Sequence, residues 1–171
     1  PIHIDEAFMS QSAIAILEGS KNLLDTYLGP PISANIITAL FFKLFGINTL
    51  TIRMQSLLFG IATNIFLYLL VRNLFNSRLA LISFFIGSFS HIAIAYSRIN
   101  VPSIEAPFFL VLTLYILSLG IKRKNLYLFA LGGISAGFSL YGYTGAKIAG
   151  ILGLGFLMMH YKELKWKYWV A

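Results

Sequence analysis

The stretch IEAPFFLVLTLYILSLGI, residues 104–121, decides the fold class of this chain. It carries one charged side chain, Glu105, next to its start, and is otherwise mostly apolar. A helix of about 20 apolar residues crosses the hydrocarbon core of a bilayer. Because lipid offers no partner for unpaired backbone groups, a spanning segment of this kind must be helical. We therefore predict that residues 104–121 form a transmembrane helix.

The composition of the whole chain agrees with this prediction. Of its 171 residues, 58% are hydrophobic and only 11% are charged, whereas about a quarter of the residues of a soluble domain are charged. The apolar runs are continuous, which argues against the short alternating segments of a membrane β-barrel. The expected fold class is all-α, a polytopic integral membrane protein.

Two kinds of apolar segment follow one another along the chain. Two short ones, residues 6–18 and 32–45, have the length of helices that lie on a membrane rather than cross it. Five longer ones are predicted to span the bilayer: residues 50–70, 79–96, 104–121, 126–143 and 146–161. We thus expect one transmembrane domain, in which residues 1–47 form an outer loop with two interfacial helices, residues 48–161 the spans, and residues 162–171 a cytoplasmic connection.

The first short segment shows a weak amphipathic pattern. On a helix, Phe8, Met9, Ala15 and Ile16 share one side, and Glu6, Ser10, Gln11 and Glu18 share the other. Ser12 interrupts the apolar side slightly, and we expect both short segments to form helices that lie on the membrane.

The net charge of +7 reads as a topology signal rather than a nucleic-acid site, because the basic residues are dispersed between apolar runs. Eight of the 13 fall in alternate connections, which we predict to be cytoplasmic: Arg72, Arg78, Lys122, Arg123, Lys124, Lys162, Lys165 and Lys167. Five of the six acids then fall on the opposite side: Asp5, Glu6, Glu18, Asp25 and Glu105.

Three of these acids, Asp5, Glu6 and Glu105, are candidates for chemistry. Asp5 has a structural reading as the N-cap of a helix, with Ile4 packed on Met9 as a hydrophobic staple; its other reading is a general base. Glu105 follows a helix start expected near Pro102. It either complements the helix dipole or faces a polar cavity at the membrane boundary.

Basic residues on the same side could bind an anion. Arg98 and Lys147 either extend toward lipid headgroups or hold a phosphate near the acids. The sequence contains no cysteine, and its three histidines lack the spacing of a zinc site. We therefore assign no metal ligands.

The order of these features resembles the N-terminal half of a GT-C glycosyltransferase of the protein-mannosyltransferase and aminoarabinose-transferase type. Four stretches carry the resemblance: HIDEAFMSQSAIAILEG (3–19), LFFKLFGINTLTIR (40–53), AYSRINVPSIEAPFFLVLTLY (95–115) and GGISAGFSLYGYTGAKI (132–148). One departure is that YLGPPIS (27–33) lacks the Lys that some relatives carry before the proline. This makes the aminoarabinose branch less favoured.

The resemblance implies transfer of a sugar from a polyprenyl-phosphate donor to a protein, lipid or glycan acceptor on the outer face of a membrane, which we expect to be a prokaryotic plasma membrane. It assigns catalysis to Asp5, with Glu6 and Glu105 supporting, and donor binding to Arg98, Lys147 and Tyr143. Membrane lipids are implied as partners, nucleic acid is not, and dependence on a divalent cation stays open.

Two other classes remain open from the sequence. A transporter or lipid flippase would favour interrupted helices and internal repeats, and a membrane scaffold would use the acids only structurally. Since the chain begins at Pro1 rather than Met, we expect a fragment with one further span upstream and more spans downstream.

Overall fold

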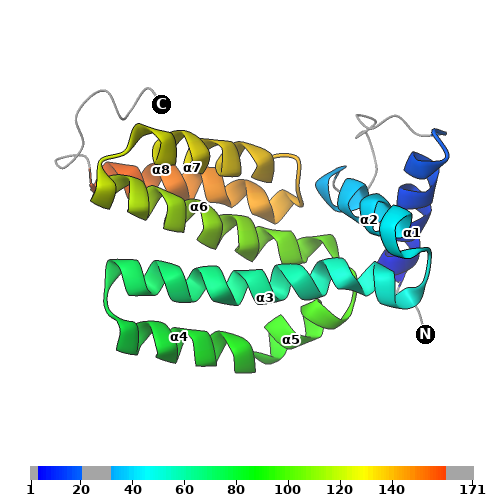
Figure 1. Ribbon diagram of the computed structural model, residues 1–171, viewed down its shortest axis with the longest axis horizontal. Coiled ribbons are helices and arrows are strands. Elements are labelled where there is room, and N and C mark those ends of the chain that lie inside the picture. Colours follow the sequence, from blue (N-terminus) through cyan, green and yellow to red (C-terminus); the bar gives the residue numbers. More distant parts are fainter. Residues whose placement is uncertain (1–3, 21–31, 161–171) are drawn as a thin grey trace.

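The computed structural model describes residues 4–20 and 32–160, and all regular elements in these ranges are helical (Figure 1). The α-helices are α1 (Ile4–Leu17), α2 (Ile32–Phe45), α3 (Thr49–Leu74), α4 (Ser77–Phe89), α5 (His91–Arg98), α6 (Glu105–Arg123), α7 (Leu126–Ser139) and α8 (Ile148–Met159). Two 3₁₀ turns, η1 (Pro102–Ile104) and η2 (Thr144–Lys147), precede α6 and α8. The predicted connection 162–171 lies outside the described residues.

The helices α3 and α6 lie side by side along the middle of the molecule (Figure 1). The helices α4 and α5 pack on α3, α7 and α8 pack on α6, and α1 and α2 pack together at the end where α3 begins. This arrangement brings the start of α6 close to α2 and to the beginning of α3, although these segments are distant in the sequence.

Two single helices are long and apolar enough to cross a bilayer, namely α3 and the continuous η1–α6 segment from Pro102 to Arg123. The α4–α5 pair passes the same test only as one span, bent by 56° at Ser90. The last two predicted spans correspond to shorter apolar helices. The residues predicted as the spans 50–70 and 104–121 thus form helices of sufficient length and apolar composition, and the count of five spans is not confirmed.

Polar side chains fix the helix starts. The side-chain oxygens of Asn48, Asn76 and Asn125 each accept a hydrogen bond of 2.9 Å from a backbone N–H in the first turn of α3, α4 and α7. Such caps satisfy one of the N–H groups that a helix leaves unpaired at its beginning. Pro102 begins η1, as the sequence predicts, since proline lacks the N–H that has no partner there.

The ends of α3 and α6 lie together at the far side of the bundle from α1. Asn73 donates to Ser118 over 2.8 Å, and Lys122 donates to Asn73 over 3.3 Å. Arg72 at the end of α3 and Lys122 and Arg123 at the end of α6 therefore lie at one end of the bundle, away from Glu6 and Glu105. The sidedness of the bundle in the membrane stays a prediction.

The predicted pattern of α1 is wrong at Glu6. Glu6, grouped with the polar side, is 1% exposed, whereas Gln11 and Glu18 of the same side are exposed. The buried side of α1 consists of Glu6, Met9, Ser12 and Ala13, and it packs against α2. The polar contacts of Glu6, described below, override the apolar pattern.

The staple is also absent, since Ile4 is 84% and Met9 1% exposed. Because α1 already begins at Ile4, Asp5 lies in its first turn and not before it.

Candidate functional site

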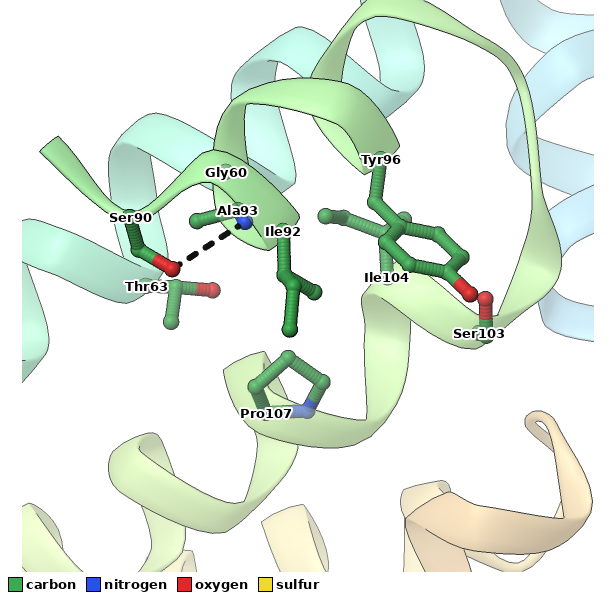
Figure 2. Close-up of a pocket in the computed structure, with 9 residues that line it drawn as sticks. All are labelled: Gly60, Thr63, Ser90, Ile92, Ala93, Tyr96, Ser103, Ile104 and Pro107. Atoms are coloured by element: carbon green, nitrogen blue, oxygen red, sulfur yellow. Dashed lines mark hydrogen bonds between the residues drawn. The ribbon is translucent and has the colours of Figure 1, made fainter. Parts of the chain in front are cut away.

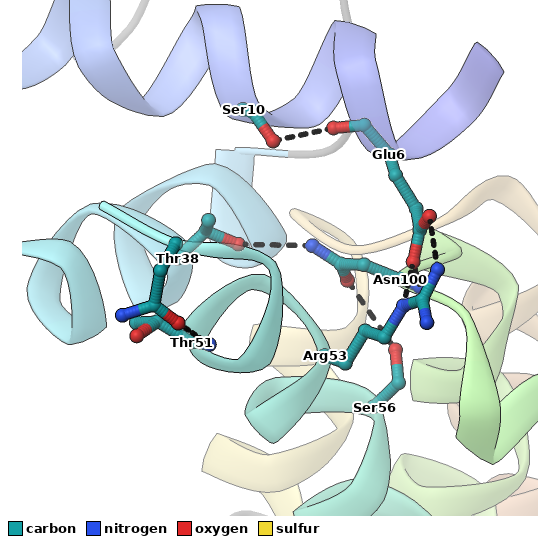
Figure 3. Close-up of polar contacts among 8 residues, drawn as sticks. Glu6, Ser10, Thr38, Thr51, Arg53, Ser56 and Asn100 are labelled. Atoms are coloured by element: carbon teal, nitrogen blue, oxygen red, sulfur yellow. Dashed lines mark hydrogen bonds and ion pairs between the residues drawn. The ribbon is translucent and has the colours of Figure 1, made fainter. Parts of the chain in front are cut away.

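Glu6 is the buried member of an ion pair between α1 and α3, in which Arg53 is partly exposed (Figure 3). Its Oε1 accepts from Arg53 Nε over 2.8 Å, and its Oε2 accepts from Arg53 Nη2 over 3.0 Å. The backbone N–H of Asn100 donates to the same Oε1 over 3.1 Å. Paired, charge-assisted hydrogen bonds of this kind fix the orientation of both planar groups. Glu6 is therefore held in place by α3 and by the segment before η1.

Glu105 is the second buried acid, and it lies at the first residue of α6 with no exposed surface. Its Oε2 accepts from Ser33 Oγ in α2 over 2.7 Å. Its Oε1 accepts from Gln55 Nε2 in α3 over 3.5 Å. The backbone amide of Tyr143 also bonds to this carboxyl group. Glu105 therefore joins three separate parts of the chain to the start of α6.

A series of hydrogen bonds connects the two acids. Thr38 Oγ1 donates to Gln55 Oε1 over 2.5 Å and accepts from Asn100 Nδ2 over 3.4 Å. Since Asn100 also bonds to Glu6, and Gln55 to Glu105, the path is continuous through α2, α3 and the segment before η1. All of these side chains except Arg53 are buried. We call the set Glu6, Thr38, Arg53, Gln55, Asn100 and Glu105 the acid network.

Asp5, the residue before Glu6, is not one of these buried side chains. It is exposed and lines a pocket of about 220 Å³ together with Ala95, Tyr96, Ile99 and Val101. Its neighbour Glu6 is bonded to Arg53 and to the backbone of Asn100, just after α5. The first turn of α1 therefore has a fixed position relative to α5. Among the described residues that line this pocket, Asp5 is the one carboxylic acid.

The three residues predicted to bind the donor are exposed. Arg98 ends α5, Lys147 ends η2, and Tyr143 comes just before η2. Within the described part of the chain, neither Arg98 nor Lys147 belongs to the acid network or to the lining of the Asp5 pocket. Arg98 directly precedes Ile99, a lining residue, whereas Lys147 follows the turn whose backbone contacts Glu105.

Sequence reasoning missed four members of the network, namely Arg53, Gln55, Thr38 and Asn100. A charged residue inside an apolar run is costly and points to a polar partner. Arg53, which is charged, and Gln55, which is polar, lie within the predicted span 50–70. Both therefore indicated that polar partners lie nearby. Thr38 and Asn100 gave no such signal, because short polar residues are common near helix ends. In the described residues, no group of three His, Asp or Glu side chains is placed to hold a metal ion.

The long apolar helices, with exposed large hydrophobic side chains along α3 and α4, define a helical integral membrane protein. A family model described as dolichyl-phosphate-mannose-protein mannosyltransferase matches residues 29–171. The chain belongs to this family, which is part of the GT-C superfamily. The resemblance inferred from the sequence is thus confirmed. The matched range includes Glu105 but not Asp5 or Glu6.

An uncharacterized protein of Aquifex aeolicus (strain VF5) is similar to this chain, with 34% identity over 178 residues. The alignment covers 98% of this chain and 36% of that protein. The chain therefore spans little more than a third of the length of this relative. No solved structure matches the chain.

Proposed function

We propose that this chain is part of a membrane glycosyltransferase that moves a sugar from a polyprenyl-phosphate donor to an acceptor on the non-cytoplasmic face. Family membership supports the class of reaction. The observation that carries the assignment of residues is the pair Asp5–Glu6, in which one carboxylate is anchored by Arg53 and the next lines an open pocket. Such a pair presents a fixed, solvent-reachable base.

The proposed reaction needs one base and one cationic patch. The Asp5 carboxylate accepts the proton of the acceptor hydroxyl, and the hydroxyl oxygen attacks the anomeric carbon of the sugar. The bond between this carbon and the phosphate oxygen breaks, and the lipid phosphate leaves with the bonding electrons. Attack opposite to the leaving group inverts the anomeric configuration. Arg98 and Lys147 stabilise the departing phosphate electrostatically.

In this proposal, Glu6 and Glu105 support the reaction by holding other residues in position. Both carboxylates are buried, so an acceptor hydroxyl does not reach them from the pocket that Asp5 lines. Glu6 fixes the first turn of α1, and Glu105 fixes the turn that carries Tyr143 and precedes Lys147. They are positioning residues for Asp5 and for the donor-binding groups.

The test is transfer by the full-length protein, in detergent or nanodiscs, from labelled polyprenyl-phosphate sugars. Asp5→Asn should lower kcat by about 10²- to 10⁴-fold, the contribution typical of a general base. Glu18→Gln, which changes another exposed acid on the same chain segment, should transfer normally. Wild-type rates from Asp5→Asn would remove Asp5 from the mechanism.

One observation favours a second candidate, a lipid flippase or transporter. The α4–α5 span is broken by 56°, and interrupted helices are common in transporters. Reconstituted protein that fails to transfer sugar from any donor, yet moves labelled polyprenyl phosphate between leaflets, would decide for this alternative.

A further inference from the structure

A cavity of about 390 Å³ lies at the break between α4 and α5, where α3 and the start of α6 complete its walls (Figure 2). Its surface is mainly apolar, with Ile92, Ala93, Ile104 and Pro107 in the lining. Ser90 lies at one end, and Tyr96 and Ser103 lie at the other. Non-regular backbone at membrane depth is tolerated where it lines a cavity, which fits a break at Ser90.

The deep end of this cavity offers few free hydrogen-bonding groups. The hydroxyl of Thr63 donates to the carbonyl oxygen of Phe59 over 2.7 Å, and the hydroxyl of Ser90 accepts from the N–H of Ala93 over 3.4 Å. Both bonds lie within the local helix. An apolar ligand could therefore fill the cavity at little cost in lost polar contacts.

Tyr96 belongs to two pockets at once. It lines this apolar cavity and also the smaller pocket that contains Asp5. The same short helix, α5, ends at Arg98, at the end of the bundle that holds the acids. Along α5, an apolar site, an acidic site and a cation thus follow one another within about two helical turns.

From this arrangement we propose that the cavity holds the isoprene units nearest the phosphate of a polyprenyl-phosphate ligand, and that Tyr96 separates this chain from the polar group beside Asp5. The proposal rests on the proposed function, since it names where that donor's chain lies. Arg98, at the surface end, is next to where the phosphate would emerge. The chain would run from there toward Ser90, deeper in the bundle.

The experiment measures binding of sugar-free, radiolabelled polyprenyl phosphate to the full-length protein in nanodiscs, so that no transfer is needed. Ala93→Phe fills the cavity. We expect it to weaken binding by about tenfold, the equivalent of one or two CH₂ groups no longer buried. Ala130→Phe is the matched control, because Ala130 is also half-buried but lies on α7, outside the cavity. It should bind like the wild type.

A second measurement locates the chain directly. Polyprenyl phosphate with a diazirine on its second isoprene unit should label residues 90–107 in the wild-type protein and lose this labelling in Ala93→Phe. Labelling confined to other helices, or equal affinities of the two Phe variants, would overturn the proposal. If Ala93→Phe does not fold, Ile92→Ala, which enlarges the cavity, should shift the labelled positions, and unchanged labelling would count against the proposal.

The outcomes separate the two proposals. Normal binding and labelling without sugar transfer from any donor would remove only the proposed glycosyltransferase reaction. If sugar transfer depends on Asp5 but Ala93→Phe changes neither affinity nor labelling, only the proposed chain site is wrong.

Discussion

The carboxylates of Glu6 and Glu105 are joined through Asn100, Thr38 and Gln55 by a continuous path of hydrogen bonds. The path crosses from α1 through the segment before η1, α2 and α3 to the start of α6. Buried polar groups are costly unless all are satisfied, and a complete network fixes one arrangement of the helices that contribute to it. The end of the bundle that carries the candidate site is therefore built on polar contacts.

Removing the hydroxyl group of Thr38 should break this path at its middle. In Thr38→Val, Gln55 loses its donor and Asn100 loses its acceptor while the volume stays similar, so we expect a loss of about 1–3 kcal/mol in unfolding free energy. Thermal unfolding in detergent measures this effect. Thr38→Ser keeps the hydroxyl and should recover most of the loss; equal destabilisation by both variants would show that packing, not hydrogen bonding, matters there.

The two members of the ion pair should respond unequally to substitution. The Arg53 side chain is 37% exposed and that of Glu6 1%. Arg53→Met leaves a buried carboxylate without its cation and should be the more destabilising of the two substitutions. Glu6→Gln leaves a cation that water can reach and should cost less. Denaturant unfolding of both variants in micelles gives the order, and a larger loss in Glu6→Gln would contradict the buried position of Glu6.

Neighbouring glycines in α7 should behave in opposite ways. A Cβ on Gly132 would lie 2.6 Å from Leu117 Cδ2, whereas a Cβ on Gly133 would meet no atom within 4 Å. Since Leu117 is buried, Gly132→Ala should cost about 1–3 kcal/mol by overpacking. Gly133→Ala should stabilise the protein by up to about 1 kcal/mol, because alanine favours helices. Melting temperatures of the two variants provide the comparison.

The turn after α7 should be sensitive at Gly142. A Cβ there would lie 3.0 Å from Glu105 Oε2 and 3.3 Å from the carbonyl oxygen of Ser139. Gly142→Ala should displace the turn that leads to Tyr143 and Lys147, and should raise KM for the proposed donor by about tenfold, a loss of some 1.4 kcal/mol in binding.

Gly145→Ala is the control for this turn, because its nearest atoms would lie 3.4 Å away at ordinary contact distance. It should leave KM unchanged. If both variants kept the wild-type KM, the contact between this turn and Glu105 would have no part in donor binding.

Part of the fold could be predicted because it depends on local sequence. The helices of residues 50–70 and 104–121, the two short helices before them and the start at Pro102 all follow from apolar length and backbone chemistry. The bend at Ser90 has a local signal, because Gly87, Ser88, Ser90 and His91 interrupt the apolar run, but the predicted span 79–96 passes straight through it. The pattern of α1 failed because the burial of Glu6 depends on Arg53, which lies on another helix.

The apolar runs are enough to make this chain helical and suited to a lipid environment, since such runs leave the backbone no other way to satisfy its polar groups. The order of the sequence motifs also indicates the family. Which acids are buried together, and which one lines a pocket, became clear from the packing of the helices. A charge is buried only where distant segments of the chain supply its partners, and a local sequence pattern does not predict those partners.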